Sequence, residues 1–283
     1  MSDVSMVGNW SMLHPAWFAL GACTIALWGM NHWVGCVEVN QRLLRRAGLV
    51  GLLGSFWGGH LLVVLSEPSL ILDDPLRLLN FLEGAKGVFG AFMGAALFGG
   101  LYLLYRRQPV LAYADAAVPA VALGYAVARI GCFLNGDDFG TVTSVPWAVQ
   151  FPSGTDAYAA HLNRGLIEFG APLSLPVHPT QLYHAVSGLL LFVFLSRWQG
   201  SWSGSRVALA LAGYGALRFS IEWFRGDAAA VLGPLHLSHL FSLLFMLAGV
   251  SLWWWKGVRR ELQSPPHAIL SQPEEALAPM TMK

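Results

Sequence analysis

Long apolar runs constrain this chain more than any other feature of its sequence. A helix needs about 20 consecutive apolar residues to cross the hydrocarbon core of a bilayer. We expect seven such spans, at residues 15–36, 47–66, 87–105, 112–134, 179–197, 205–225 and 235–255. Hydrophobic residues make up 55% of the 283 residues and charged residues only 12%, which is too apolar for a soluble domain of ordinary composition. The sequence therefore predicts an all-α, polytopic integral membrane protein.

The positions of the basic residues predict how the spans are oriented. Short cytoplasmic loops retain Lys and Arg. Four clusters fall on one side of the predicted spans: Arg42, Arg45 and Arg46; Arg106 and Arg107; Arg197 and Arg206; and Lys256, Arg259 and Arg260. The N-terminus then lies outside and the C-terminus inside. Within a membrane domain of residues 1–260, residues 137–177 would form a small extracytoplasmic cap, and residues 261–283 a disordered cytoplasmic tail.

Charge and cysteine content argue against other classes of site. The net charge is +1, and no sustained basic patch with interleaved aromatic residues occurs, so nothing favours nucleic acid as a partner. The three cysteines have no zinc-type spacing, so no metal is expected from them.

The segment ARIGCFLNGDDFG, residues 128–140, ends the fourth predicted span with an arginine and a polar turn. An arginine near the end of a membrane helix is costly unless an anion meets it, so Arg129 marks a candidate functional site. The alternative interpretation is an arginine that extends its side chain to the lipid headgroups. The Asn-Gly-Asp-Asp turn that follows allows a ligand to approach the backbone closely.

Other unusual polar residues fall at the same face of the membrane as Arg129. With the predicted orientation, the outer half of the membrane contains His60, Lys86, Arg129, His178, Gln181, Tyr183, Arg218 and Glu222. Independent anchoring would populate both interfaces, so this distribution indicates one shared site. Arg218 and Glu222 are four residues apart and can pair on one helix face, although a purely structural ion pair is the alternative. Two arginines and a carboxylate match an anionic lipid headgroup, because a guanidinium binds phosphate through parallel donors.

The segment HPTQLYHA, residues 178–185, begins the fifth predicted span. Pro179 suits the first turn of a helix. His178, Gln181 and Tyr183 place a titratable ring, an amide and a phenol at the interface. The alternative is that these residues only decorate the interface, where tyrosine is common.

Three segments of the chain together resemble the signatures of the bacterial prolipoprotein diacylglyceryl transferases. ARIGCFLNGDDFG is similar to Gly-Arg-hydrophobic-Gly-Asn/Cys-Phe-x-Asn-Gly-Glu/Cys, and HPTQLYHA to His-Pro-Ser/Thr-Gln-Leu-Tyr-Glu-Ala. GYGALRFSIEWFRGD, residues 213–227, is similar to Gly-Tyr-Gly-x-x-Arg-x-x-x-Glu-Phe-x-Arg. The resemblance extends over residues 15–260. It implies an enzyme of the bacterial inner membrane that transfers the diacylglyceryl group of phosphatidylglycerol to the lipobox cysteine thiol of a prolipoprotein. Glycerol phosphate leaves and a thioether forms, without a metal or soluble cofactor.

The resemblance also implies roles for individual residues. Arg129 would bind the lipid phosphate, and Arg218, oriented by Glu222, would assist the leaving group or the thiol. The residues expected to bind substrate are Trp28, Asn135, Gly136, Asp137, Gly140, His178, Gln181 and Tyr183.

The chain departs from this family where a base is expected. The family commonly has a histidine in a Ser-Phe-His-Gly-Gly stretch of the third helix, proposed to act on the thiol, but the matching segment here, residues 84–94, has Phe89. Further departures are Trp28, where a tyrosine is usual, and His184, where a glutamate is usual. His60, after two glycines in the second span, is the alternative base, because imidazole titrates near neutrality. It is equally compatible with a structural role.

Two other functions remain as alternatives. A relative that keeps the arginines but lacks the base would be catalytically silent or retargeted, and would bind anionic lipid or signal peptides. A transporter would favour midplane sites, discontinuous helices and an internal repeat, and no convincing repeat is present.

Overall fold

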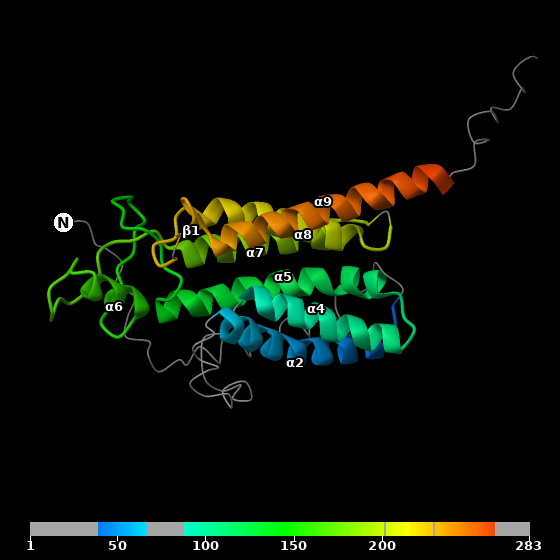
Figure 1. Ribbon diagram of the computed structural model, residues 1–283, viewed down its shortest axis with the longest axis horizontal. Helices are drawn as coiled ribbons and strands as arrows, with labels where there is room; N and C mark the ends of the chain where they lie inside the picture. Colours follow the sequence, from blue (N-terminus) through cyan, green and yellow to red (C-terminus); the bar gives the residue numbers. More distant parts are fainter. Residues whose placement is uncertain (1–38, 67–87, 201, 229, 264–283) are drawn as a thin grey trace, which may run out of the picture.

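The computed structural model describes residues 39–66, 88–200, 202–228 and 230–263 of the chain. Its long helices run side by side (Figure 1): α2 (Gln41–Ser66), α4 (Val88–Tyr105), α5 (Val110–Asn135), α7 (Thr180–Arg197), α8 (Ser205–Glu222) and α9 (Leu237–Gln263). A short helix, α6 (Asp156–Asn163), and a hairpin of β1 (Ala230–Leu232) and β2 (Leu235–His236) lie at one end of this bundle.

Six of the seven predicted spans coincide with a long helix, and the first, at residues 15–36, lies outside the described residues. The helices Val110–Asn135 and Leu237–Lys256 are long and apolar enough to cross a membrane, and Gly90–Tyr105 is a shorter apolar helix. The boundaries differ from the prediction in one place that matters. Because α8 ends at Glu222 rather than at residue 225, Arg225 lies in the following turn.

Glycines mediate the packing of α2 against α4. A Cβ atom on Gly58 would collide with the carbonyl oxygen of Gly90 and the backbone of Gly94, and one on Gly94 would collide with the carbonyl of Gly54. The two backbones therefore touch. Small residues four apart permit this approach in membrane helices, where van der Waals contact replaces the hydrophobic driving force that lipid does not supply.

Helix α5 lies between this helix pair and the remaining helices (Figure 1). It packs mainly against α7 and also against α8, while α8 packs closely against α9. At the end of the bundle away from the hairpin, the buried Asp115 of α5 accepts hydrogen bonds from the backbone N–H groups of Gly204 at 2.6 Å and Val207 at 2.9 Å. The first N–H groups of a helix have no partner within it, so this carboxylate stabilises the start of α8.

The residues between α5 and α7 form a lobe at the hairpin end, in the segment predicted as the cap. Its core is a cluster of buried side chains: Phe139, Val149, Phe151, Ala157 and Val177. Val149 and Val177 exchange backbone hydrogen bonds of 3.1 and 2.9 Å, which hold the lobe closed on itself. Residues 264–283 of the predicted tail lie outside the described residues. Trp28 and Lys86 also lie outside them.

We expect Gly94→Ala to lower the apparent melting temperature in detergent, because an added Cβ meets backbone that cannot yield. Overpacking of this kind costs about 1–3 kcal/mol. Gly100→Ala on the same helix is the matched control, since its Cβ would meet only Val110 Cγ1 at 3.9 Å and alanine favours the helix. Equal stability of the two variants would contradict backbone contact between α2 and α4.

Candidate functional site

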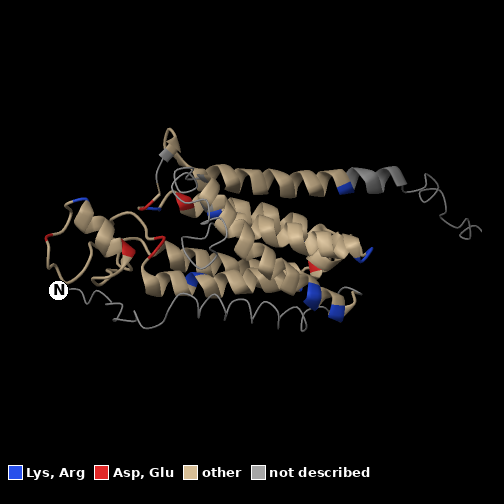
Figure 2. Ribbon diagram, turned by 60° about the horizontal axis from the view of Figure 1, so that its bottom comes forward, with Lys and Arg blue, Asp and Glu red and all other residues tan. Residues whose placement is uncertain are grey.

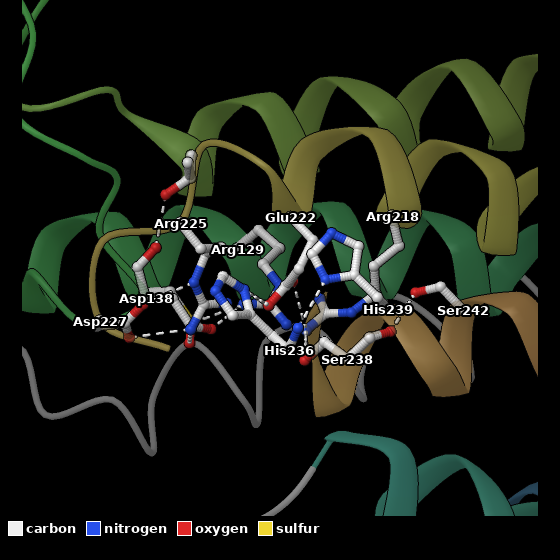
Figure 3. A network of polar contacts seen from close by, with 12 residues as sticks. Arg129, Asp138, Arg218, Glu222, Arg225, Asp227, His236, Ser238, His239 and Ser242 are labelled. Carbon is white, nitrogen blue, oxygen red and sulfur yellow. Dashed lines mark hydrogen bonds and ion pairs between the residues drawn. The ribbon is translucent and has the colours of Figure 1, made fainter. Parts of the chain in front are cut away.

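Polar side chains gather where α5 and α8 end and α9 begins (Figure 3). Arg129 of α5, only 2% exposed, makes an ion pair through Nη1 with Oδ2 of Asp138. The other carboxylate oxygen of Asp138 accepts a hydrogen bond from Nη2 of Arg225 at 2.7 Å. Arg225 also donates from Nε and Nη2 to the two oxygens of Asp227, at 2.7 and 2.9 Å. Two guanidinium groups are thus held around one carboxylate.

The turn after α5 places Asp138 in this position. Gly136 ends the helix with φ +74°, and its N–H donates to the carbonyl of Cys132 at 2.9 Å. Glycine adopts this left-handed conformation without steric cost. Asp138 also has a positive φ, +55°, a conformation that aspartate tolerates better than most residues. These two left-handed residues reverse the chain direction, so that the Asp138 carboxylate faces Arg129.

The start of α7 holds the turn from the other side. Thr180 Oγ1 donates to the carbonyl oxygen of Asp138, and Gln181 Nε2 donates to that of Asp137, both at 2.6 Å. Gly140 donates its N–H to the carbonyl of His178 at 3.1 Å, and a Cβ on Gly140 would collide with that carbonyl. Gln181 and Gly140 therefore shape the turn through the backbone.

The two adjacent carboxyl groups differ in their titration. Burial alone would raise the pKa of Asp138, but the guanidinium groups of Arg129 and Arg225 outweigh it and hold that pKa well below its usual range. Burial raises the pKa of Asp137 to about 6, and the negative charge of Asp138 adds to this effect. At neutral pH the site therefore keeps Asp138 charged, while the pKa of Asp137 lies much closer to neutrality than that of an ordinary aspartate.

A second group of polar residues surrounds Glu222, which is fully buried. Its Oε2 lies 3.7 Å from Nη2 of Arg218, which is the pairing predicted from their spacing. Its Oε1 lies 3.6 Å from Nδ1 of His236. Arg218 Nη2 is also 3.4 Å from the hydroxyl of Ser238 at the start of α9. One carboxylate thus faces a guanidinium on α8 and an imidazole in β2, immediately before α9.

Aromatic rings lie on the inner side of the arginines. The guanidinium carbon of Arg129 is 5.1 Å from the centre of the Tyr125 ring, within the range of cation–π attraction. Tyr125 and Tyr214 meet edge to face with centroids 5.4 Å apart, and Phe92 of α4 contacts both rings. The fully buried His184 packs against Tyr125 with centroids 6.3 Å apart. Arg129 therefore lies against a cluster of aromatic side chains.

The other residues predicted from the sequence occupy different places. His178 and Tyr183 lie 3.1 Å apart from Nδ1 to the phenol oxygen, and Trp147 of the lobe donates to that phenol at 2.7 Å. Asn135 is exposed at the end of α5. His60 is buried on α2, whose main packing partner is α4.

The sequence interpretation missed four residues of the site: Asp138, Arg225, His236 and His239. Asp138 and Arg225 lay inside segments that were already singled out, each a few residues from a chosen position. The two histidines lay within the first five residues of the last predicted span, 235–255. In each case the signal was a titratable or charged residue at a span boundary.

Comparisons with known proteins agree on one family. The family model described as prolipoprotein diacylglyceryl transferase matches residues 12–255. Relatives named phosphatidylglycerol–prolipoprotein diacylglyceryl transferase include that of Erwinia tasmaniensis, 30% identical over 88% of this chain and 94% of the relative. The relative from Dechloromonas aromatica is 30% identical over 85% of this chain and 96% of the relative. The relative from Burkholderia lata is 35% identical over 74% of this chain and 77% of the relative. The described site residues all lie within the matched range.

We expect Asp138→Asn to lower the free energy of unfolding at pH 7 by about 2–3 kcal/mol, because it leaves the buried charge of Arg129 uncompensated. The lowered pKa means that the Asp138 carboxylate stabilises the fold above its unfolded pKa of about 4 and loses this effect as the pH falls below it. The melting temperatures of parent and variant should therefore begin to converge below about pH 4 and meet only as the pH falls through the lowered pKa of Asp138.

The exposed Asp156 supplies the matched control, since Asp156→Asn removes the same charge outside the cluster. A gap between parent and Asp138→Asn that is as wide in acid as at pH 7 would contradict a role for the Asp138 charge.

Proposed function

The chain belongs to the prolipoprotein diacylglyceryl transferase family, and on that premise we propose that it transfers the diacylglyceryl group of phosphatidylglycerol to the lipobox cysteine of prolipoproteins. The observation that carries this proposal is the pair of buried guanidinium groups, Arg129 and Arg225, held around one carboxylate beside a third guanidinium, Arg218. Such a cluster is built to bind an anion in apolar surroundings.

The site would lie in the outer half of a bacterial inner membrane that seven helices cross, with the N-terminus outside and the C-terminus inside. Figure 2 supports this orientation, because basic residues collect at the end of the helices away from the lobe. Those at or near that end are Arg42, Arg45, Arg46, Arg106, Arg107, Arg197 and Arg206. Since cytoplasmic loops retain Lys and Arg, the lobe and the site face outward.

Asp138 marks the place that the lipid phosphate would take. A phosphodiester presents two anionic oxygens, as a carboxylate does, and guanidinium groups bind either through parallel donors. Arg129 and Arg225 would exchange part of their contact with Asp138 for the phosphate. Gly136, Asp137 and Gly140 would form the backbone of this headgroup pocket, with Asn135 at its edge.

The arginines would then accelerate breakage of the bond between the glyceryl carbon and the phosphate oxygen. Negative charge on that oxygen grows as the bond breaks, so donors aimed at it stabilise the transition state more than the ground state. Arg218, held by Glu222, would approach the reacting atoms from α8. His178, Gln181 and Tyr183 would line the entrance from α7, and Trp28 would complete the binding site from the first span.

The second candidate is a silent or retargeted relative that binds anionic lipid or signal peptides without transfer. It is favoured by Phe89, near the start of α4, where the resemblance implies a histidine. An assay with labelled phosphatidylglycerol and a lipobox peptide separates the two. Transfer by the purified protein supports the enzyme, whereas lipid binding without transfer supports the silent relative.

Arg129→Ala should reduce transfer in this assay by at least 100-fold, roughly the loss seen when one donor to a developing oxyanion is removed. Arg129→Lys should restore little, because a point charge cannot reproduce two parallel donors. Arg197→Ala, which removes an exposed guanidinium at the far end of α7, is the control and should keep the parent rate. Full activity of correctly inserted Arg129→Ala protein would end this assignment.

Arg218 and Glu222 should act as one unit. Each single alanine variant is expected to lose most of the transfer activity, and the double variant to be little worse than the more damaged single one. Rates of all four proteins form the double-mutant cycle. If the fold-loss of the double variant equals the product of the two single fold-losses, Arg218 and Glu222 have separate roles.

A further inference from the structure

Two histidines beside Glu222 have no part in the mechanism described so far. His239 is 1% exposed, and its ring packs against Phe219 and Trp223 with centroids 5.0 and 4.8 Å apart. The His236 side chain is 16% exposed, and its ring lies 5.2 Å from that of His239. Figure 3 shows both rings among the guanidinium groups of the site.

A hydrogen bond assigns the proton position of the His239 ring, and the nearby Glu222 carboxylate bears on that of His236. The backbone N–H of His236 lies 3.0 Å from Nδ1 of His239. A backbone N–H can only donate, so Nδ1 of His239 is its unprotonated nitrogen, and this ring serves to hold the main chain of His236. Nδ1 of His236 faces Oε1 of Glu222 at 3.6 Å. This separation exceeds that of a hydrogen bond, but a carboxylate can only accept, so a shortened contact would place the proton on Nδ1 of His236 and leave the lone pair on Nε2.

This arrangement is that of a general base with an orienting carboxylate. In hydrolases a buried carboxylate holds the imidazole in one tautomer and stabilises the imidazolium that forms when the other nitrogen takes a proton. Distances slightly longer than a hydrogen bond are usual before substrate binds and shorten in the complex. Glu222 is suited to this role because its second oxygen is already balanced by Arg218. The partial exposure of His236 leaves its ring accessible to an incoming thiol.

We propose that His236, oriented by Glu222 and positioned by His239, is the group that takes the proton from the acceptor thiol in this chain. The assignment rests on the proposed function. It explains how a member of the family can work with Phe89 on α4. His60, the base suggested by the sequence, is the competing candidate and lies on α2, which packs mainly against α4.

The step balances without any further reactant. The S–H bond breaks and its proton passes to Nε2 of His236, while the sulfur electron pair forms the bond to the glyceryl carbon. The bond between that carbon and the phosphate oxygen breaks, and its electron pair stays on the oxygen of the departing glycerol phosphate. The proton on Nε2 then returns to this oxygen, which restores the neutral imidazole.

The test compares transfer by the full-length parent, His236→Gln and His60→Gln between pH 5.5 and 9, roughly the range in which imidazole and thiol titrate. The charged and titratable groups around the dyad are Arg218, Glu222, Arg225 and His239, and all are retained in each variant. We expect His236→Gln to transfer about 100-fold or more slowly at pH 7, the usual contribution of a general base. The deficit should shrink as the pH approaches the thiol pKa of about 8.5. His60→Gln is included because His60 is the other candidate base, and a general-base deficit confined to His60→Gln would overturn the assignment to His236.

Two further measurements separate a catalytic from a structural role. Binding of labelled phosphatidylglycerol and the melting temperature should be unchanged in His236→Gln, and added imidazole should partly restore transfer by His236→Ala. A parent-like rate and profile in His236→Gln would overturn the assignment, and so would a loss that is independent of pH and accompanied by loss of lipid binding. No transfer by the parent at any pH would instead overturn the proposed function itself, and the base assignment with it.

Discussion

The shared carboxylate of Asp138 is the interaction on which this site depends. A guanidinium as buried as that of Arg129 is tolerated only when an anion faces it. Asp138 supplies that anion and binds Arg225 with its other oxygen, so one side chain joins the end of α5 to the turn after α8. Backbone bonds reinforce the junction, because Thr141 donates to Phe224 at 2.8 Å and Gly226 donates to Phe139 at 3.0 Å.

Two kinds of chemistry lie on either side of this junction, one around Asp138 and one around Glu222. Around Asp138 the protein presents fixed positive charge to an anion, and the donors are already oriented before a ligand arrives. Around Glu222 it presents a carboxylate between a guanidinium and an imidazole, which is an arrangement for moving a proton. The start of α9 contributes to the second group and α7 to the first, so bond breakage and proton transfer would be supported by different helices.

Span positions and the Arg218–Glu222 pair followed from the sequence because both obey local rules, apolar length and the four-residue helical spacing. Asp138 did not, because two adjacent aspartates are equivalent until the left-handed turn decides which carboxylate faces Arg129. Arg225 was placed inside a span, since nothing in the apolar pattern marks the end of α8 at Glu222. The role of His236 depends on packing between α8 and α9, which no local pattern reports.

Helix α5 is attached to α8 at both of its ends. Asp115 holds the first turn of α8, and Arg129 reaches the turn that follows it through Asp138 and Arg225. The two attachment residues are about 21 Å apart along the helix axis. The position of the arginines therefore depends on the length of helix between the two attachments as well as on charge. If α8 slid along α5 at its Asp115 attachment, Arg225 would move away from Asp138. Changes around Asp115 would then displace the arginines from the opposite end of α5.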